Sequence, residues 1–282
     1  MLFKMKGLTV FDFEMTKKIK TGISIGTLIL LICIFSLFKY VRQQKHDLKG
    51  IVEAGRLTVV TEGSSSGLLV NGDTVSGFQY EIIKAFADSL GVELVVTEQN
   101  DMKKCVEGLK NGDYDLIANF IPTTTQWKNE LLYSDPIFTS HQVLVQHMMS
   151  DSSRVNVLTK QTQLANDTVY IPLNSPNKIL LEHLSNDIAA PIHIIEMKNM
   201  NAERLIRLVA EGKIKNTICE VLMAERFKNQ YGNIDISMPV GFAQQQVWAV
   251  PVKSVQLLEK LNAFLYDFVG SSDYWKIYSK YY

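Results

Sequence analysis

The sequence predicts an α/β fold of two lobes that follows a single transmembrane helix. Three features favour this class: an uncharged run near the N-terminus, an alternation of strand and helix patterns after it, and a second set of the same patterns further along the chain. With 46% apolar, 21% charged and 10% aromatic residues among 282, the composition is that of a folded globular protein.

The uncharged run is the first of these features. The 18 residues between Lys20 and Lys39, TGISIGTLILLICIFSLF, would form a helix of about 27 Å, which is close to the hydrocarbon thickness of a bilayer. No small-residue cleavage site follows it, so we interpret it as an uncleaved anchor. Met15 is an alternative start to Met1.

The flanks of this run do not fix its orientation, because lysine and arginine are balanced on its two sides. A short Lys-rich head before a single hydrophobic run is typical of a signal anchor. We therefore expect a cytoplasmic segment over 1–20, a transmembrane anchor over 21–38, a juxtamembrane tether over 39–54, and a C-terminal domain outside the cytoplasmic membrane, in the periplasm.

The alternating patterns come next, with short connections that favour a mostly parallel sheet covered by helices. Asn71-Gly72 predicts a tight turn, and Gly91 and Gly112 predict helix ends. The first set comprises strand 56–61, helix 80–90, strand 93–97, helix 101–110 and strand 116–119.

A second set of strands and helices predicts the second lobe. Asn174, Ser175 and Pro176 are expected to open its first helix, as capping residues followed by proline. The set comprises strand 169–172, strand 192–196, helix 202–211, strand 215–218 and helix 221–228, and a pair of amphipathic helices over 257–282 closes the chain. The aromatic residues of the last helix suit packing or, alternatively, a sugar-binding patch.

Charge and composition exclude several kinds of function. Lys+Arg and Asp+Glu both number 29, so nucleic acid is not an expected partner. Cys33, Cys105 and Cys219 lack metal-ligand spacing and are interpreted as small packing residues. The histidines show no metal-ligand spacing either, and there is no phosphate-binding glycine loop, so neither a metal nor a cofactor is expected.

Four short segments resemble the bacterial extracellular solute-binding proteins of family 3, which are type 2 periplasmic binding proteins of the polar amino acid class. They are GFQYE at 77–81, LKNGDYD at 109–115, YSDPI at 133–137, and Lys280-Tyr281. The resemblance implies a two-lobed, periplasmic-binding-protein-like type II domain over 55–282. Lobe 1 would comprise about 55–142 and 246–282, and lobe 2 about 143–245.

The same resemblance implies a ligand site between the lobes, formed by loops at strand ends and by helix N-termini. The positions in this sequence that it indicates are Glu62, Ser64, Ser65, Ser66, Asn119, Phe120, Thr124, Trp127, Asn174, Ser175 and Glu220.

Two of these positions have alternatives that the sequence leaves open. Members of the family that bind amino acids carry an arginine three residues after a threonine, whereas here Trp127 follows Thr124 at that spacing. A one-residue slip would place Gln126 or Lys128 there instead, and only Lys128 keeps a charge. Trp127 is either a core residue or a stacking platform for a ring. Glu220 is either a helix cap or the acidic group that meets a ligand amino group.

The resemblance implies an extracytoplasmic protein that captures a small amino-acid-like or peptide-like ligand for an ABC transporter, without catalysis. The phrase GFQYEIIKAFADSLGVELVV is also similar to the binding domain of membrane-bound lytic transglycosylases of the F type, whose catalytic domain would begin where this chain ends. One alternative is a tethered sensor of cell-wall peptides or muropeptide fragments that acts with a cell-wall enzyme. Another is a dehydratase-like enzyme that uses Glu62 and Glu220.

Overall fold

A computed structural model describes residues 29–34, 47–122, 127, 129–148 and 157–282. The chain divides into two units, Met1–Lys45 and His46–Tyr282. Most of the anchor expected over 21–38 lies outside the described residues. Within the described parts, no helix combines the length and the apolar character that crossing a membrane requires.

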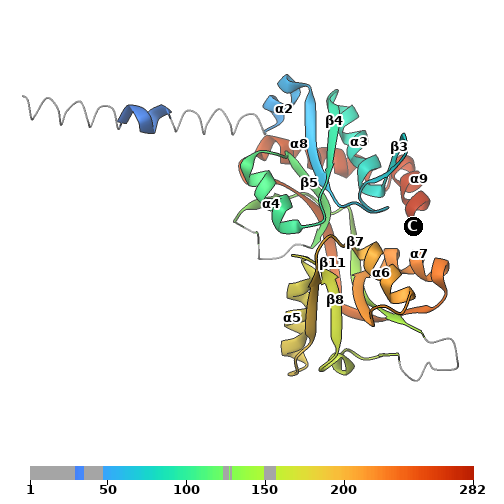
Figure 1. The fold of residues 1–282 in the computed structure, drawn as a ribbon. Coiled ribbons are helices and arrows are strands. Elements are labelled where there is room, and N and C mark those ends of the chain that lie inside the picture. The colour runs from blue at the N-terminus through green and yellow to red at the C-terminus, as the bar shows by residue number, and fades with distance from the viewer. Residues whose placement is uncertain (1–28, 35–46, 123–126, 128, 149–156) are drawn as a thin grey trace, which may run out of the picture. The chain divides into compact units, whose positions relative to one another are not determined.

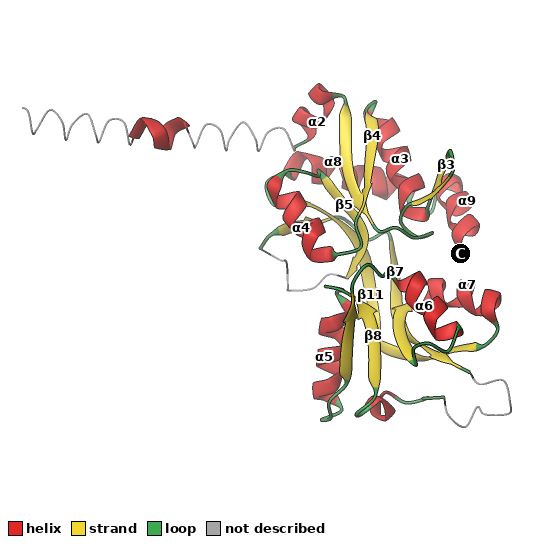
Figure 2. Cartoon of the chain, viewed as in Figure 1, coloured by secondary structure: helices red, strands yellow, loops and turns green. Residues whose placement is uncertain are grey.

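The second unit contains two α/β lobes (Figures 1 and 2). In lobe 1, β1 is flanked by β4 and β5 and runs parallel to both. Gly91 and Gly112 end α3 and α4 in left-handed conformations, as predicted. The elements of this lobe are α2 (Leu48–Ala54), β1 (Arg56–Thr61), the hairpin β2 (Leu69–Asn71) and β3 (Thr74–Ser76), α3 (Phe78–Leu90), β4 (Glu93–Glu98), α4 (Met102–Asn111), β5 (Leu116–Pro122), β6 (Leu131–Tyr133), α8 (Val255–Phe268) and α9 (Ser272–Tyr281).

Lobe 2 repeats this arrangement, with β8 lying between β9 and β10 and parallel to both. Its first helix begins one residue later than expected: Pro176 is the N-cap, Asn174 has a left-handed φ of 56°, and the helix starts at Asn177. The elements are η2 (Gln161–Leu164), β8 (Thr168–Pro172), α5 (Asn177–Asp187), β9 (His193–Met197), α6 (Ala202–Ala210), β10 (Asn216–Glu220) and α7 (Val221–Tyr231).

Two long antiparallel strands join the lobes, and the sequence did not predict them. They are β7 (Phe138–His147) and β11 (Ile234–Pro251), and they run between the upper and lower halves in Figure 1. Through them the strands follow the order β4-β1-β5-β11-β7-β10-β8-β9, so one sheet path passes through both lobes.

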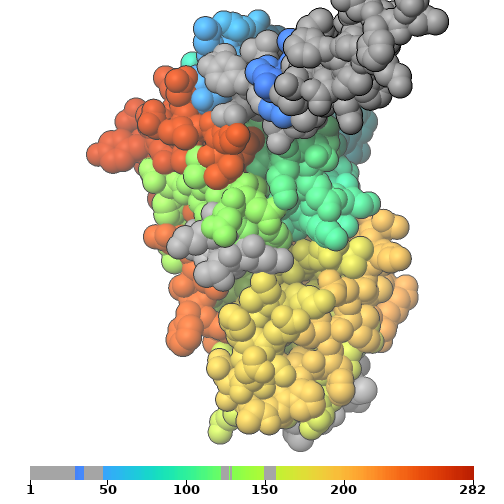
Figure 3. Space-filling model, turned by 90° about the vertical axis from the view of Figure 1, so that its left-hand side faces the viewer, coloured from blue at the N-terminus to red at the C-terminus, as the bar shows by residue number. Residues whose placement is uncertain are grey.

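The hydrophobic core divides in the same way. Trp248, in the second part of β11, packs with Phe78 and Leu57 in lobe 1, whereas Ile234, in the first part, packs with Phe227 in lobe 2. Each lobe therefore has its own core, and the long strands contribute to both. Segments of the two lobes meet on the face drawn in Figure 3.

Four C-terminal tyrosines pack in or against the core of lobe 1. The rings of Tyr274, Tyr278, Tyr281 and Tyr282 all lie within 6.4 Å of the Phe78 ring, measured between ring centroids. Their arrangement is mostly edge-to-face, which is favourable for buried aromatic pairs. Packing, rather than a sugar-binding patch, is the role that the structure gives to these tyrosines.

Candidate functional site

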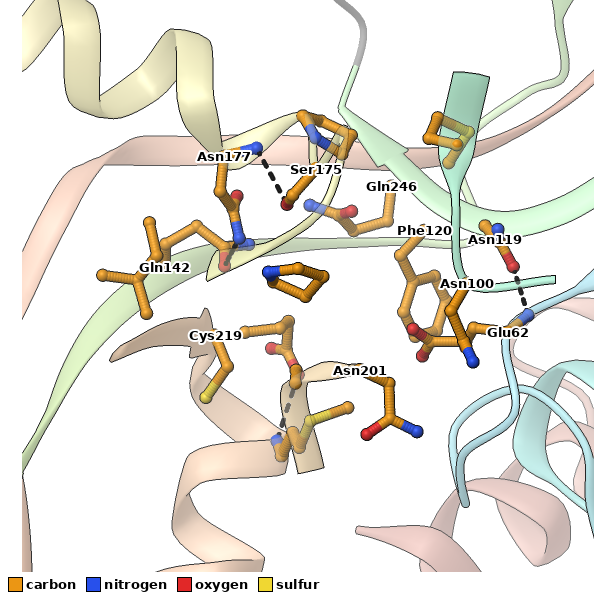
Figure 4. A pocket seen from close by; sticks show the side chains of 17 residues that line it. Glu62, Asn100, Asn119, Phe120, Gln142, Ser175, Asn177, Asn201, Cys219 and Gln246 are labelled. Atoms are coloured by element: carbon orange, nitrogen blue, oxygen red, sulfur yellow. Dashed lines mark hydrogen bonds between the residues drawn. The ribbon is translucent and has the colours of Figure 1, made fainter. Parts of the chain in front are cut away.

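A cavity of about 120 Å³ lies between the two lobes, at the ends of their strands (Figure 4). In open α/β sheets this is where ligands bind, since the loops after neighbouring strands converge there. The lining residues are Glu62, Asn100, Met102, Asn119, Phe120 and Gln246 from lobe 1 and its adjoining strands, and Gln142, Pro172, Ser175, Pro176, Asn177, Asn201, Ala202, Ile218, Cys219, Glu220 and Met223 from the lobe 2 side.

Glu62 follows β1 directly and is partly exposed, at the wall of this cavity. Its backbone N–H donates to Asn119 Oδ1 at 2.7 Å, and its Oε1 accepts the Ser64 hydroxyl at 2.8 Å. Its Oε2 has no hydrogen-bond partner among the described residues. Burial raises the pKa of Glu62 to about 7, opposed by the Ser64 hydrogen bond and assisted by the charge of Glu203.

Glu220 is the last residue of β10 and the N-cap of α7. Its carboxylate accepts the N–H groups of Leu222 at 3.0 Å and Met223 at 3.2 Å, together with the hydroxyl of Ser140. Burial raises the pKa of Glu220, and these hydrogen bonds partly offset the effect. Since a carboxylate has about four acceptor positions, capping leaves Glu220 little capacity for a ligand.

The rest of the lining is neutral. The polar members are amides, from asparagine and glutamine, and one serine, while Phe120 and two methionines supply apolar surface. No lysine, arginine or histidine is among the described residues that line the cavity. The ionisable carboxyl groups of Glu62 and Glu220 therefore face a space in which no described side chain supplies a positive charge.

Hydrogen bonds between the lobes surround the cavity. The backbone N–H of Ser65, in lobe 1, donates to Glu203 Oε1 at 3.0 Å, and the Ser65 hydroxyl joins Glu203 and Arg226. Asn174 Nδ2 donates to Asp101 Oδ1 at 2.8 Å on another side. The lobes are thus in contact around the site, in a closed arrangement.

The predicted site residues separate into two groups. Those that line the cavity are Glu62, Asn119, Phe120, Ser175 and Glu220. Ser65 and Asn174 lie at contacts between the lobes instead. The hydroxyl of Ser64 donates to Glu62, and the hydroxyl of Ser66 forms a hydrogen bond with that of Tyr282. Thr124 lies outside the described residues.

Trp127 is a core residue and does not line the cavity. Its side chain is buried, in a cluster that includes Met102, Val106 and Leu131. Of the two alternatives that the sequence left open, the structure supports packing over a stacking platform.

Sequence reasoning missed most of the amide groups in the lining. Gln142 and Gln246 are on β7 and β11, which the pattern of residues did not reveal. Asn201 is the N-cap of α6 and Asn100 precedes α4, so a search for helix caps could have found them. In Figure 4, Asn100 lies on the same side of the cavity as Glu62, and Gln142 lies opposite.

The described residues contain no group of three or more His, Cys, Asp or Glu side chains arranged to hold a metal ion. Hydrogen bonds to the lining carboxylates come from Ser64, Ser140 and the start of α7, and they hold these groups in place. The arrangement suits the binding of a small polar molecule between the lobes.

Curated proteins similar to this chain are membrane-bound lytic murein transglycosylases F. The one from Desulfosudis oleivorans is 28% identical over 241 residues, which cover 86% of this chain and 52% of that protein. The one from Alcanivorax borkumensis is 25% identical over 189 residues, which cover 67% of this chain and 39% of that protein. The chain therefore spans about half the length, or less, of these relatives.

Solved structures share the fold. An amino acid ABC transporter substrate-binding protein, AbpA from Streptococcus pneumoniae bound to L-arginine, has a TM-score of 0.70 at 19% identity, covering 83% of this chain and 97% of that one. A solute receptor for L-cysteine of Neisseria gonorrhoeae has a TM-score of 0.71 at 17% identity, covering 83% and 92%. At these identities the likeness establishes the type II periplasmic-binding-protein fold.

The family itself is established by a model that matches residues 57–282, which is nearly all of the two-lobed domain. The match covers both lobes and the strands that join them, so it includes every residue that lines the cavity. The chain belongs to the bacterial extracellular solute-binding proteins, family 3.

Proposed function

We propose that this chain is an extracytoplasmic binding protein that captures a small amino-acid-like or peptide-like molecule between its lobes and delivers it to an ABC transporter. The cavity between the lobes carries the proposal, because both lobes contribute to its lining and hydrogen bonds between them surround it. Its volume of about 120 Å³ equals that of about four water molecules at roughly 30 Å³ each, which suits a small organic molecule.

Binding is tested by isothermal titration calorimetry of the full chain in a mild detergent, with a panel of amino acids, short peptides and muropeptide fragments. We expect saturable binding of at least one compound and a higher unfolding temperature in its presence, because a ligand specific for the folded state stabilises it. Small-angle scattering should show a more compact domain with ligand. A panel that gives neither heat nor compaction contradicts the proposal.

We further propose that residues 21–38 anchor the protein in the cytoplasmic membrane, with 1–20 in the cytoplasm, 39–54 as a tether and the binding domain in the periplasm. Support comes from the uncharged run in the sequence and from the extracellular character of the family. Protease added to spheroplasts should digest the domain, and the chain should sediment with membranes. Protection of the domain until lysis would contradict this orientation.

The similarity to lytic transglycosylases supports a second candidate, a tethered sensor of cell-wall peptides that acts on a partner enzyme. This candidate predicts that muropeptide fragments bind more tightly than free amino acids. It also predicts that a cell-wall enzyme, and no permease, co-purifies with the tethered protein.

A further inference from the structure

The described lining of the cavity has acidic side chains and no basic ones that could compensate a negative charge on a ligand. Glu62 and Glu220 line it, and no described lysine, arginine or histidine does. A ligand carboxylate would therefore be a third acidic group in a small space. At an effective dielectric constant of about 20, a like charge at about 6 Å weakens binding by roughly 100-fold.

Helix N-termini are the usual alternative for holding an anion, and those of α4, α5, α6 and α7 all adjoin the cavity. Several of their free N–H groups are already engaged within the protein. Asp101 caps α4, Asn201 caps α6 and Glu220 caps α7. At α5, Ser175 accepts the N–H groups of Asn177 and Lys178. The helices thus present capped ends to a ligand.

Acceptors, by contrast, are free. Glu62 Oε2 has no partner among the described residues. Gln246 is 1% exposed and lines the cavity, and its side-chain N–H donates to the carbonyl of Gln244 at 3.3 Å. That bond fixes the orientation of the amide, so its oxygen is left as an acceptor without a partner in the described structure.

Two amide donors complete the lining. Asn119 accepts through Oδ1 from Glu62, and Gln142 accepts through Oε1 from Asn177, so the NH₂ group of each is left for a ligand. A neutral NH₂ group suits a carbonyl or hydroxyl oxygen better than it compensates a full negative charge. The described part of the lining therefore combines a negative charge with neutral donors and acceptors.

We propose that the ligand is an organic cation that presents an ammonium or guanidinium group to Glu62 and Gln246 and carries no carboxylate. An amine or the amide of a basic amino acid has this chemistry. The inference depends on the proposed function, since it names the class of molecule that the same cavity captures.

Matched pairs of compounds test it. L-arginine, agmatine and L-argininamide share a guanidinium group and differ in whether a carboxylate, hydrogen or a neutral amide occupies the α-carbon; L-lysine and cadaverine form a second pair. In calorimetry with the full chain, we expect each amine or amide to bind at least about tenfold more tightly than its amino acid. Equal or tighter binding of L-arginine and L-lysine would overturn the inference and leave the proposed function intact.

Two variants test whether the positive group of the ligand lies beside Glu62. Glu62→Gln keeps the size of the side chain and removes its charge, so affinity for agmatine should fall by about 10- to 100-fold. Glu259→Gln, an exposed position on α8 away from the cavity, is the matched control and should bind as the unchanged protein does. Unchanged affinity in a folded Glu62→Gln protein would overturn the assignment.

A measurement on the unchanged protein covers the case in which the variant does not fold. Affinity for agmatine should fall as the pH is lowered through about 7, because protonation removes the charge of Glu62. A flat profile would overturn the inference. If the amines and amides do not bind but another member of the wider panel does, the ligand class is wrong; if nothing in either set binds, the proposed function fails as well.

Discussion

Replacing Glu62 by glutamine should change how the stability of the ligand-free protein depends on pH. Burial raises the pKa of this carboxyl from 4.5 to about 7 in the folded state, while the unfolded chain keeps the ordinary value. The folded state therefore holds the proton over a range in which the unfolded state has released it. The stability that this contributes is present below about pH 4.5 and is lost as pH rises through about 7.

The size of the effect follows from the difference between the two pKa values. A pKa of about 7 against 4.5 corresponds to at most roughly 3 kcal/mol of unfolding free energy. Because glutamine does not titrate, the unfolding free energy of Glu62→Gln should not include this loss as the pH rises. Relative to the unchanged protein, the variant should gain up to roughly 3 kcal/mol between about pH 4 and pH 8.

Urea unfolding of both proteins at a series of pH values measures this difference. Glu220 and all other groups titrate in both proteins, so subtracting one profile from the other isolates Glu62. Glu259→Gln, at an exposed position, should give a profile parallel to that of the unchanged protein. If the Glu62→Gln profile is also parallel, burial does not raise the pKa of Glu62 and the electrostatic account of the cavity is wrong.

Three further changes test other parts of the structure. Trp127→Ala removes a buried indole and should lower the unfolding free energy in urea by about 3–5 kcal/mol, with unchanged ligand selectivity; lost selectivity at full stability would place Trp127 in the site. Ser65→Ala removes a hydroxyl that joins the lobes, so scattering should show a less compact liganded domain and affinity should fall about tenfold; an unchanged radius would contradict this. Gly77→Ala would put a Cβ 2.0 Å from the Gly67 carbonyl oxygen and should cost more stability in urea than Gly72→Ala, where φ is also positive but the space is open; equal losses would refute it.

The elements that local patterns predicted well are those with strong local signals. The β-branched run Arg56–Thr61 is β1 at its predicted bounds. Gly91 and Gly112 end their helices because glycine adopts the left-handed conformation of a helix C-cap at low cost. Helix α3 starts two residues earlier than expected, at Phe78.

The parts that could not be predicted depend on long-range pairing. Strands β7 and β11 contain polar residues such as Gln142 and Gln246 that do not alternate with apolar ones in the way an ordinary half-buried strand does. Gln246 is buried and Gln142 is partly buried, because both strands cross between the lobes and border the cavity. The amide lining of the site was missed for the same reason.

The role of Trp127 could not be decided from the sequence either. Its place in the sequence, relative to Asp115 and Ser134, is where the family resemblance implied a ligand contact, and an indole suits either a site or a core. Packing against Met102 and Leu131 decides for the core, and that choice depends on residues far from it in the sequence.

The acidic cavity gives a physical reason for closure to depend on the ligand. When the lobes meet through Ser65 and Glu203, Glu62 is partly buried with no described positive charge beside it. Burial raises its pKa to about 7 and makes its ionised form costly. In an open arrangement water would solvate the same carboxylate. A bound cation, as proposed above, removes this cost only in the closed state, so it binds that state more tightly and shifts the population towards it. A neutral ligand of the same size would leave the charge of Glu62 uncompensated, and we expect it to produce less compaction in scattering than agmatine does at equal occupancy.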